Sequence, residues 1–249
     1  MSTTTTRPDL PSETPAQAVT GDRFVAGAML TVAVLLLALQ GLAGGIIPPL
    51  AIFALLYLGL GVAVGRRRSR WLLVAVIVLT LVHLVGSLPF FVANLSHPES
   101  PASFLSEAFV GLALLTALIG AIGGLRGARP RSRRPVAFGA IAVAALAVVV
   151  SVVAATGAES ELLQPGDVAV EAVRSTFPEL LEVPAGETVL WVDNQDPFHH
   201  TLVIDGTDVQ HNLPGSTSVR LTVDLDPGTY RYFCDVPGHE RMEGQIVVR

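Results

Sequence analysis

The feature that most constrains this chain is an uncharged stretch of 42 residues, residues 24–65. A single α-helix of that length would be about 63 Å long, roughly twice the hydrocarbon thickness of a bilayer. Glycines and a Pro pair at residues 41–49 are typical of a helix end followed by a new helix start. The stretch therefore predicts two membrane-spanning helices joined by a turn.

Three further apolar segments follow, each near the ~20 residues that a membrane crossing needs. The complete set predicts an all-α membrane bundle of about five transmembrane helices over residues 23–156. The predicted spans are residues 24–42, 46–65, 71–94, 104–124 and 136–156. Residues 1–22 are rich in Thr, Ser and Pro, and we expect them to form a disordered tail.

The arginines indicate how the bundle is oriented, because short loops that carry Lys or Arg stay in the cytoplasm. Loops 66–70 and 126–134 are rich in Arg, whereas loop 96–101 has none. This distribution predicts a multi-pass protein of the cytoplasmic membrane, with its N-terminus in the cytoplasm and everything after residue 156 outside. The alternative is that the first span is a cleaved signal peptide, which leaves the topology of the other spans unchanged.

Two ionisable residues in the predicted spans are candidate functional residues of the membrane part. His83 lies midway along the third span, and Glu107 lies near the outer end of the fourth. Ionisable groups inside a membrane are expensive and often functional. The alternative is structural, with His83 bonded to a neighbouring helix and Glu107 at the water interface.

The part after residue 156 is chemically different from the bundle. It carries 5 Arg and 16 acidic residues, net −11, whereas the part before it carries 11 Arg and 5 acidic residues, net +6. Such an acidic domain excludes a nucleic-acid binder, because phosphate contacts need clustered Lys and Arg. The single Cys excludes an intrachain disulfide.

The acidic part begins with a polar linker, residues 157–167, and continues as a β domain, residues 168–249. Val219, Leu221, Val223 and Leu225 alternate with polar residues, which is typical of a half-buried strand. Pro-Gly and similar turn signals separate several other short strand-like segments. Short strands at this spacing predict an all-β antiparallel sandwich.

Four potential metal ligands concentrate in this β domain. Cys234, His239 and Met242 lie within nine residues, and strand alternation places His200 on the inner face, with His199 as the alternative. Two imidazoles, one thiolate and a weak thioether form the ligand set of a mononuclear electron-transfer copper site. Zinc also binds Cys and His, but Met is a poor zinc ligand, so copper is the better prediction.

Residues 168–249 resemble the cupredoxins, the plastocyanin and azurin group of small blue copper proteins. The resemblance rests on a His-Thr pair that opens a strand, on the 33 residues between His200 and Cys234, and on a Tyr-x-Tyr-x-Cys-x4-His-x2-Met-x-Gly hairpin. It implies a Greek-key sandwich with one mononuclear copper per chain. It further implies that His200, Cys234 and His239 are equatorial ligands, that Met242 is the axial ligand, and that Thr201 ties the two ligand-bearing segments together.

One departure from the family pattern bears on the axial ligand. Only two residues separate His239 from Met242, fewer than in some cupredoxins. Glu243 or a backbone oxygen is therefore an alternative to Met242.

The sequence predicts an electron carrier rather than an enzyme. A copper site in a rigid sandwich on the outer face of the membrane suits one-electron transfer, and the net charge of −11 predicts a redox partner protein with a basic docking face. The alternative is an extracytoplasmic copper binding and delivery protein. A third class, an interaction domain on a membrane protein, would need no copper.

Overall fold

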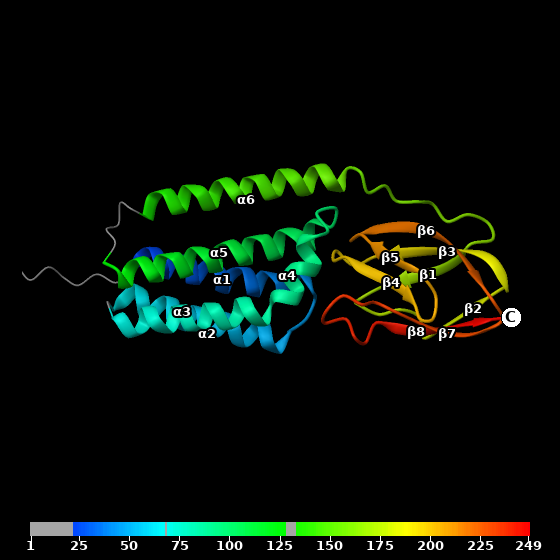
Figure 1. Cartoon of the computed structure of the whole chain (residues 1–249), viewed down its shortest axis with the longest axis horizontal. Coiled ribbons are helices and arrows are strands. Elements are labelled where there is room, and N and C mark those ends of the chain that lie inside the picture. Colours follow the sequence, from blue (N-terminus) through cyan, green and yellow to red (C-terminus); the bar gives the residue numbers. More distant parts are fainter. Residues whose placement is uncertain (1–21, 68, 128–132) are drawn as a thin grey trace, which may run out of the picture.

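The computed structural model describes residues 22–67, 69–127 and 133–249. These residues form a helical bundle and a β-sandwich that lie end to end (Figure 1). The all-α class of the N-terminal part and the all-β class of the C-terminal part are confirmed. The predicted disordered tail lies outside the described residues, apart from Asp22.

The helical part consists of six helices in the described residues. They are α1 (Arg23–Leu42), α2 (Pro48–Arg66), α3 (Arg70–Gly86), α4 (Leu88–Leu95), α5 (Pro101–Leu125) and α6 (Arg134–Ala155). Four of these described helices, α1, α2, α5 and α6, are each long and apolar enough to cross a membrane.

A fifth candidate span is the pair α3 and α4, which is bent by 57°. The pair covers the predicted third span, residues 71–94, and the break falls at Ser87. Pro89 lies in the first turn of α4. In a continuous helix it would have no amide hydrogen for the Val85 carbonyl, and its ring would clash with that carbonyl. The apolar segment is therefore continuous in sequence but not in structure.

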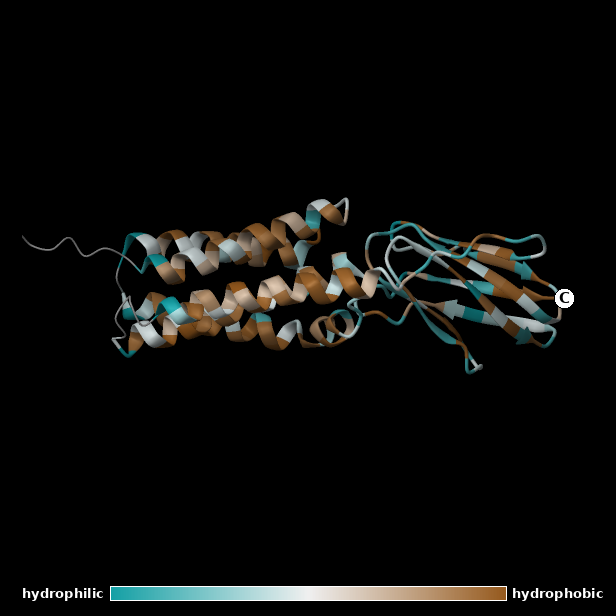
Figure 2. Ribbon diagram, turned by 90° about the horizontal axis from the view of Figure 1, so that it is seen from above, coloured by the Kyte–Doolittle hydropathy of each residue, from teal (hydrophilic) through white to brown (hydrophobic). Residues whose placement is uncertain are grey.

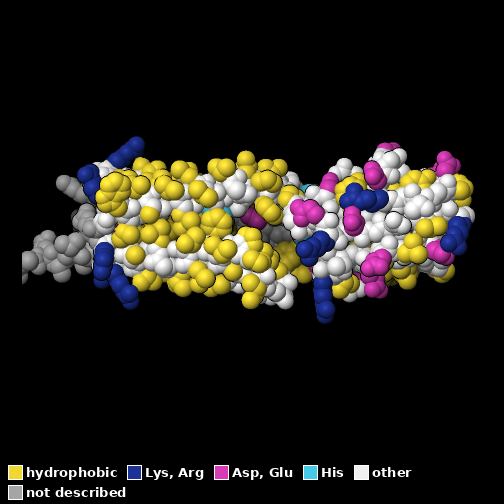
Figure 3. Space-filling model, turned by 90° about the horizontal axis from the view of Figure 1, so that it is seen from below, with side chains coloured by type: hydrophobic (Ala, Val, Ile, Leu, Met, Phe, Trp, Pro, Cys, Tyr) yellow, Lys and Arg dark blue, Asp and Glu magenta, His cyan; other side chains and the backbone are white. Residues whose placement is uncertain are grey.

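Small residues allow α1 and α2 to pack closely. A Cβ added at Gly61 would lie 3.2 Å from Met29, and one added at Gly65 would lie 3.3 Å from Ala26. The helices consist mostly of hydrophobic residues (Figure 2), and many large hydrophobic side chains are exposed on the outside of the bundle (Figure 3). Among the described residues of α6, Ser151 is the one that is buried. An outer surface of this kind suits lipid rather than water.

The end of the bundle far from the sandwich is basic (Figure 3). There Arg133 forms an ion pair with Asp22, whose carboxylate also accepts a hydrogen bond from the Val25 amide at 3.2 Å and so caps α1. This contact joins the beginning of α1 to the beginning of α6.

The sandwich has eight strands in the described residues. They are β1 (Val168–Ala172), β2 (Leu180–Val183), β3 (Gly186–Asn194), β4 (His200–Ile204), β5 (Gln210–Leu213), β6 (Thr217–Leu225), β7 (Gly228–Phe233) and β8 (Glu243–Val248). One sheet has the order β1-β3-β6 and the other β2-β8-β7-β4-β5. The core between the sheets contains residues from both, including Leu190, Leu202 and Ile246.

The sheets are mixed, which corrects the prediction of a purely antiparallel sandwich. β1 pairs with β3 in parallel, and β2 pairs with β8 in parallel, while the other pairs are antiparallel. The predicted alternation along β6 is confirmed, because Leu221, Val223 and Leu225 are buried. Alternation fixes which face a strand buries but carries no information on the direction of its partner.

The sandwich contacts the bundle through the segment that follows α4. Asn212 donates a hydrogen bond to Glu99 at 2.8 Å, and the Gly215 amide donates to Ser100 at 3.1 Å. The His199 amide donates to Ser103, at the beginning of α5, at 3.0 Å. Loop 96–101 and the sandwich therefore lie at the same end of the bundle (Figure 1).

The linker, residues 157–167, runs along the three-stranded sheet. The Glu161 amide donates to Ser218 O at 2.9 Å, and Glu161 O accepts a hydrogen bond from the Trp191 indole at 2.7 Å. The Glu161 carboxylate accepts one from the Arg220 amide. The middle of the linker is thus attached to the domain that it tethers.

Candidate metal centre

Three of the predicted ligands lie on the loop between β7 and β8. Met242 O accepts a hydrogen bond from the Cys234 amide at 2.9 Å, and the Met242 amide donates to His239 O at 2.8 Å. The turn between Cys234 and His239 places Gly238 at φ +86°, which glycine adopts without strain. The loop therefore folds back and brings Cys234, His239 and Met242 close together.

The fourth predicted ligand, His200, is the first residue of β4. Antiparallel pairing of Val203 with Phe233 aligns β4 with the end of β7, next to Cys234. His200 is fully buried, and its Nε2 lies 2.9 Å from a carboxylate oxygen of Asp196. Because a carboxylate only accepts, Nε2 carries the hydrogen and Nδ1 has a free lone pair for a metal.

The donor atoms of His200, Cys234 and His239 converge. The two Nδ1 atoms are 3.0 Å apart, and Cys234 Sγ lies 3.9 Å from His200 Nδ1 and 3.6 Å from His239 Nδ1. Ligands of one ion, at about 2.0 Å for nitrogen and 2.3 Å for sulfur, lie roughly 3–4 Å from one another. Within the described part of the chain, this is the one group of His, Cys, Asp or Glu with such spacing.

Burial prepares these groups to bind a metal. Desolvation lowers the pKa of His239 to about 4 and also lowers the pKa of His200, where Asp196 opposes the effect. Both imidazoles are therefore neutral at pH 7, the form that binds metal. Desolvation raises the pKa of the Cys234 thiol, and hydrogen bonds from Thr201 offset part of the rise.

Comparison with known families bears on the sandwich and its site. Residues 140–248 match the family model described as a cupredoxin-like domain. The C-terminal part of this chain is a cupredoxin-like domain. The matched region also takes in most of α6, from residue 140 onward.

Several solved structures are similar to the cupredoxin-like domain. The copper-containing nitrite reductase from Thermus scotoductus SA-01 is 31% identical over 36% of this chain, with a TM-score of 0.28, and the match spans 24% of that protein's length. A reduced amicyanin mutant is 19% identical over 35% of this chain and 86% of its own, with a TM-score of 0.30. A copper binding protein in its apo form is 21% identical over 37% of this chain and 100% of its own, with a TM-score of 0.29.

The donor set of the domain fits copper. Two imidazoles and a thiol are in place, and Met242 is fully buried next to Cys234. The alternative axial ligand Glu243 is directed elsewhere, since its carboxylate is 48% exposed and accepts two hydrogen bonds from Arg231. Met242 therefore remains the predicted axial ligand.

Thr201 lies between the two ligand-bearing segments of the domain. Its hydroxyl donates to Asp235 Oδ1 at 2.6 Å and accepts from the Asp235 amide at 2.9 Å. Its amide also points at Cys234 Sγ, at 3.4 Å. The structure thus places Thr201 where the family resemblance predicts a residue that ties β4 to the β7–β8 loop.

Two polar residues that support His200 were not found by sequence reasoning. Asn194, at the end of β3, donates to the carbonyls of Phe198, Leu213 and Pro214 at 2.9–3.0 Å. Its Oδ1 accepts from the Asp196 amide at 3.1 Å. The second residue is Asp196, and its position four residues before the predicted ligand His200 is the one signal in the sequence.

Asp196 has a second role in the same loop. Its carboxylate accepts the amides of Arg174 and Ser175 at 2.7 Å, and these two residues have φ of +52° and +55°. Burial raises the pKa of Asp196, but the hydrogen bonds from Ser175, His200 and Arg174 outweigh it, so the pKa lies below the usual range. An ionised Asp196 thus holds both the His200 ring and a strained turn.

His199, the alternative to His200, faces away from Cys234. Its ring stacks on His97 with centroids 4.7 Å apart, and His97 Nδ1 lies 2.9 Å from Glu99. His199 is 2% exposed, and its Nδ1 has no hydrogen-bond partner among the described residues. The structure therefore brings His200, and not His199, into the metal cluster.

The two candidate residues of the membrane part have different hydrogen-bond partners, although both line one cavity. His83 Nδ1 lies 3.1 Å from the Tyr57 hydroxyl of α2, and its ring stacks on Phe53 at 4.4 Å. The Glu107 carboxylate accepts a hydrogen bond from Asn94 at 3.3 Å. His83 thus has the neighbouring-helix contact of the structural alternative, while Glu107 lies near the domain.

Proposed function

We propose that this chain is a membrane-anchored protein with one mononuclear copper site that transfers single electrons on the outer face of the cytoplasmic membrane. The observation that carries the proposal is the convergence of His200 Nδ1, Cys234 Sγ and His239 Nδ1 at 3.0–3.9 Å, with Met242 beside them. When bound, copper would supply one-electron chemistry between Cu(II) and Cu(I).

The residues around the site support a carrier rather than a catalyst. Asp196 fixes the His200 ring, and Thr201 holds Cys234 against β4. His200, Cys234 and Met242 are buried and His239 is half-buried, which limits the access of water to the metal position. A geometry held this firmly changes little between oxidation states, which favours electron transfer.

The arrangement of charge supports the proposed orientation. The Arg side chains of the bundle gather at one of its ends, and the cupredoxin-like domain lies at the other (Figure 3). Four or five apolar helices separate the two ends. If the basic end is cytoplasmic, the domain is extracytoplasmic.

A basic partner protein is proposed to dock on the domain. Beyond residue 156 the chain carries net −11, and Asp205, Asp208, Asp235 and Glu240 are exposed. Attraction between opposite charges speeds association and is screened by salt. The oxidation rate with a basic protein acceptor should therefore fall as ionic strength rises, and a rate without salt dependence would refute this docking mode.

Copper loading of the full-length protein in detergent tests the proposal. Addition of Cu(II) to the wild type should produce an intense blue thiolate-to-copper absorption with one copper per chain. Cys234→Ser should abolish the colour and His239→Asn should change it, whereas His211→Asn, a matched change at an exposed His, should leave it intact. A colourless wild type that retains no copper would refute the proposal.

Copper delivery is the second candidate, and the His97–His199 pair favours it. These stacked imidazoles adjoin the site, and His199 Nδ1 is unpartnered in the described residues. An imidazole nitrogen with a free lone pair can receive a metal ion that leaves the site. Loss of Cu(I) to a chelator within seconds would favour delivery, whereas retention over hours would favour electron transfer.

A further inference from the structure

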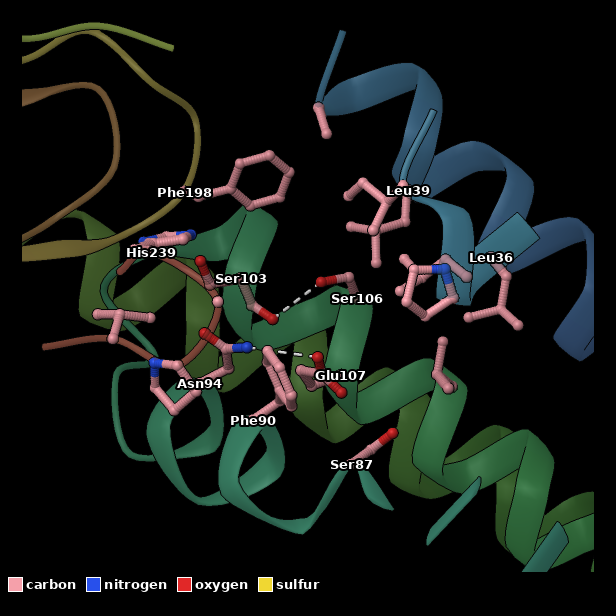
Figure 4. Close-up of a pocket in the computed structure, with 18 of the residues that line it drawn as sticks. Leu36, Leu39, Ser87, Phe90, Asn94, Ser103, Ser106, Glu107, Phe198 and His239 are labelled. Atoms are coloured by element: carbon pink, nitrogen blue, oxygen red, sulfur yellow. Dashed lines mark hydrogen bonds between the residues drawn. The ribbon is translucent and has the colours of Figure 1, made fainter. Parts of the chain in front are cut away.

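A cavity lies between the cupredoxin-like domain and the bundle, beside the hydrogen bonds that join them. Its volume is about 680 Å³, within the range of small-molecule sites. It is lined by α1, the beginning of α2, α3, α4 and α5, and on the domain by Ser175 and by the loops that carry His199 and His239 (Figure 4). One of the predicted metal ligands thus forms part of its wall.

One side of the cavity is apolar. Leu36 and Leu39 of α1, Phe90 of α4 and Phe198 of the domain face it (Figure 4). Ile46 borders it before the start of α2 and is 82% exposed on the hydrophobic outside of the bundle. A hollow lies where that hydrophobic surface meets the charged surface of the domain (Figure 3). An apolar molecule in the membrane could therefore enter beside Ile46.

The other side of the cavity carries hydrogen-bonding groups. The Asn94 amide and the Glu107 carboxylate bond to each other at 3.3 Å, and among the described residues Asn94 is the one partner of that carboxylate. The hydroxyl of Ser106 donates to Ser103 O at 3.0 Å (Figure 4). His199 also lines the cavity, and its buried Nδ1 has no partner in the described part of the chain.

This combination selects a class of ligand. An acyl chain would leave the Glu107 carboxylate with Asn94 as its one described partner and His199 Nδ1 with none, which is costly for buried groups. A small polar solute would leave the leucines and phenylalanines in contact with nothing apolar. A ring with oxygen substituents and an apolar tail satisfies both sides.

We propose that the cavity binds the ring of a lipid-soluble hydroquinone or quinone. One ring oxygen would reach the Glu107 side, the other oxygen would reach the His199 and His239 side, and the tail would leave past Ile46 into the lipid. This binding rests on the proposed function for the membrane location of the chain. It deepens that function, because it gives the chemical class of a small redox molecule that would lie next to the metal site. The binding itself requires no copper.

Equilibrium binding to the full-length protein in detergent tests the inference. The probes are a decyl-substituted benzoquinone and, under anaerobic conditions, its hydroquinone. Ser106→Phe should weaken binding of both at least about tenfold, because the new ring would fill part of the cavity. Thr116→Phe is the matched control, since Thr116 is also on α5, bonds to its own helix at 2.7 Å and lies outside the cavity.

A conservative second variant tests the role of Glu107. A carboxylate only accepts hydrogen bonds, whereas an amide also donates. Glu107→Gln should therefore weaken hydroquinone binding and strengthen quinone binding, so that the ratio of the two affinities changes by about tenfold. A merely structural role of Glu107 would not move this ratio.

The inference and the proposed function can fail separately. Cys234→Ser should lose the blue colour and still bind the quinone with wild-type affinity. Saturable quinone binding to a wild type that stays colourless would refute the proposed function alone. Binding that does not saturate, or equal affinities for Ser106→Phe and Thr116→Phe, would overturn the inference whatever the colour.

Discussion

Replacing Asn194 should strongly destabilise the cupredoxin-like domain. Asn194 is 1% exposed, donates to three carbonyls at 2.9–3.0 Å and accepts one amide. An amide nitrogen has two hydrogens, so two of the three donated bonds can be made at full strength. Asn194→Ala removes these bonds and leaves buried carbonyls unpaired.

The size of the effect follows from these contacts. A lost hydrogen bond costs about 1 kcal/mol, and a buried group left unpaired costs about 1–3 kcal/mol, so Asn194→Ala should lower the free energy of unfolding by roughly 3–5 kcal/mol. With a urea m-value of about 2 kcal/mol/M, the midpoint should fall by roughly 2 M.

Urea unfolding of the copper-free protein in detergent, followed by tryptophan fluorescence, measures this shift. The chain has two Trp, and a Trp71→Phe background leaves Trp191 on β3 as the reporter. Asn212→Ala is the matched control, because Asn212 makes one hydrogen bond, to Glu99 of the bundle, and its Oδ1 is unpartnered among the described residues. A midpoint for Asn194→Ala no lower than that for Asn212→Ala would refute the reasoning.

Three more predictions concern the site and the bundle. Thr201→Val should leave copper bound but shift the thiolate-to-copper band and speed copper loss to a chelator, because Cys234 and Asp235 lose their contacts with the hydroxyl; an unchanged spectrum and rate would contradict this. Copper affinity should rise about tenfold per pH unit from pH 6 to 8. The reason is that the Cys234 thiol, whose pKa is raised by burial, must lose its proton, whereas His239 has a pKa of about 4 and is already neutral. A copper affinity that does not change with pH would contradict this prediction. Arg133→Met should lower the melting temperature of the bundle, because the partly buried carboxylate of Asp22 loses its partner, and the blue absorption of the distant domain serves as the unaffected control.

Local patterns in the sequence predicted much of this architecture. Uncharged runs predicted the helical part, and alternation along β6 predicted its buried face, because both follow from periodicity within one segment. The cluster of His200, Cys234 and His239 was predicted because a thiol, imidazoles and a thioether at short spacing have few purposes other than metal binding.

The features that the sequence did not predict depend on contacts between distant segments. The parallel pairing of β1 with β3 and of β2 with β8 is decided by the partner strands rather than by the residues of β1 and β2. Asn194 and Asp196 are residue types that are common in solvated loops. Their supporting hydrogen bonds form only where β3, β4 and the turn at residues 174–175 meet. The break at Ser87 had its signal in Pro89, but the hydrophobic run across it concealed the bend.

The attachment of the linker at Glu161 governs how far the domain can travel. Only a few residues between the end of α6 and Glu161 are free to extend, a span of roughly 15–20 Å at full stretch. In the proposed membrane location, the His239 edge, which faces the bundle, would thus stay near the headgroup layer even if the domain swings. Molecules that arrive by lateral diffusion within a bilayer would then reach that edge directly, while those in the aqueous phase would first meet the acidic surface of the domain.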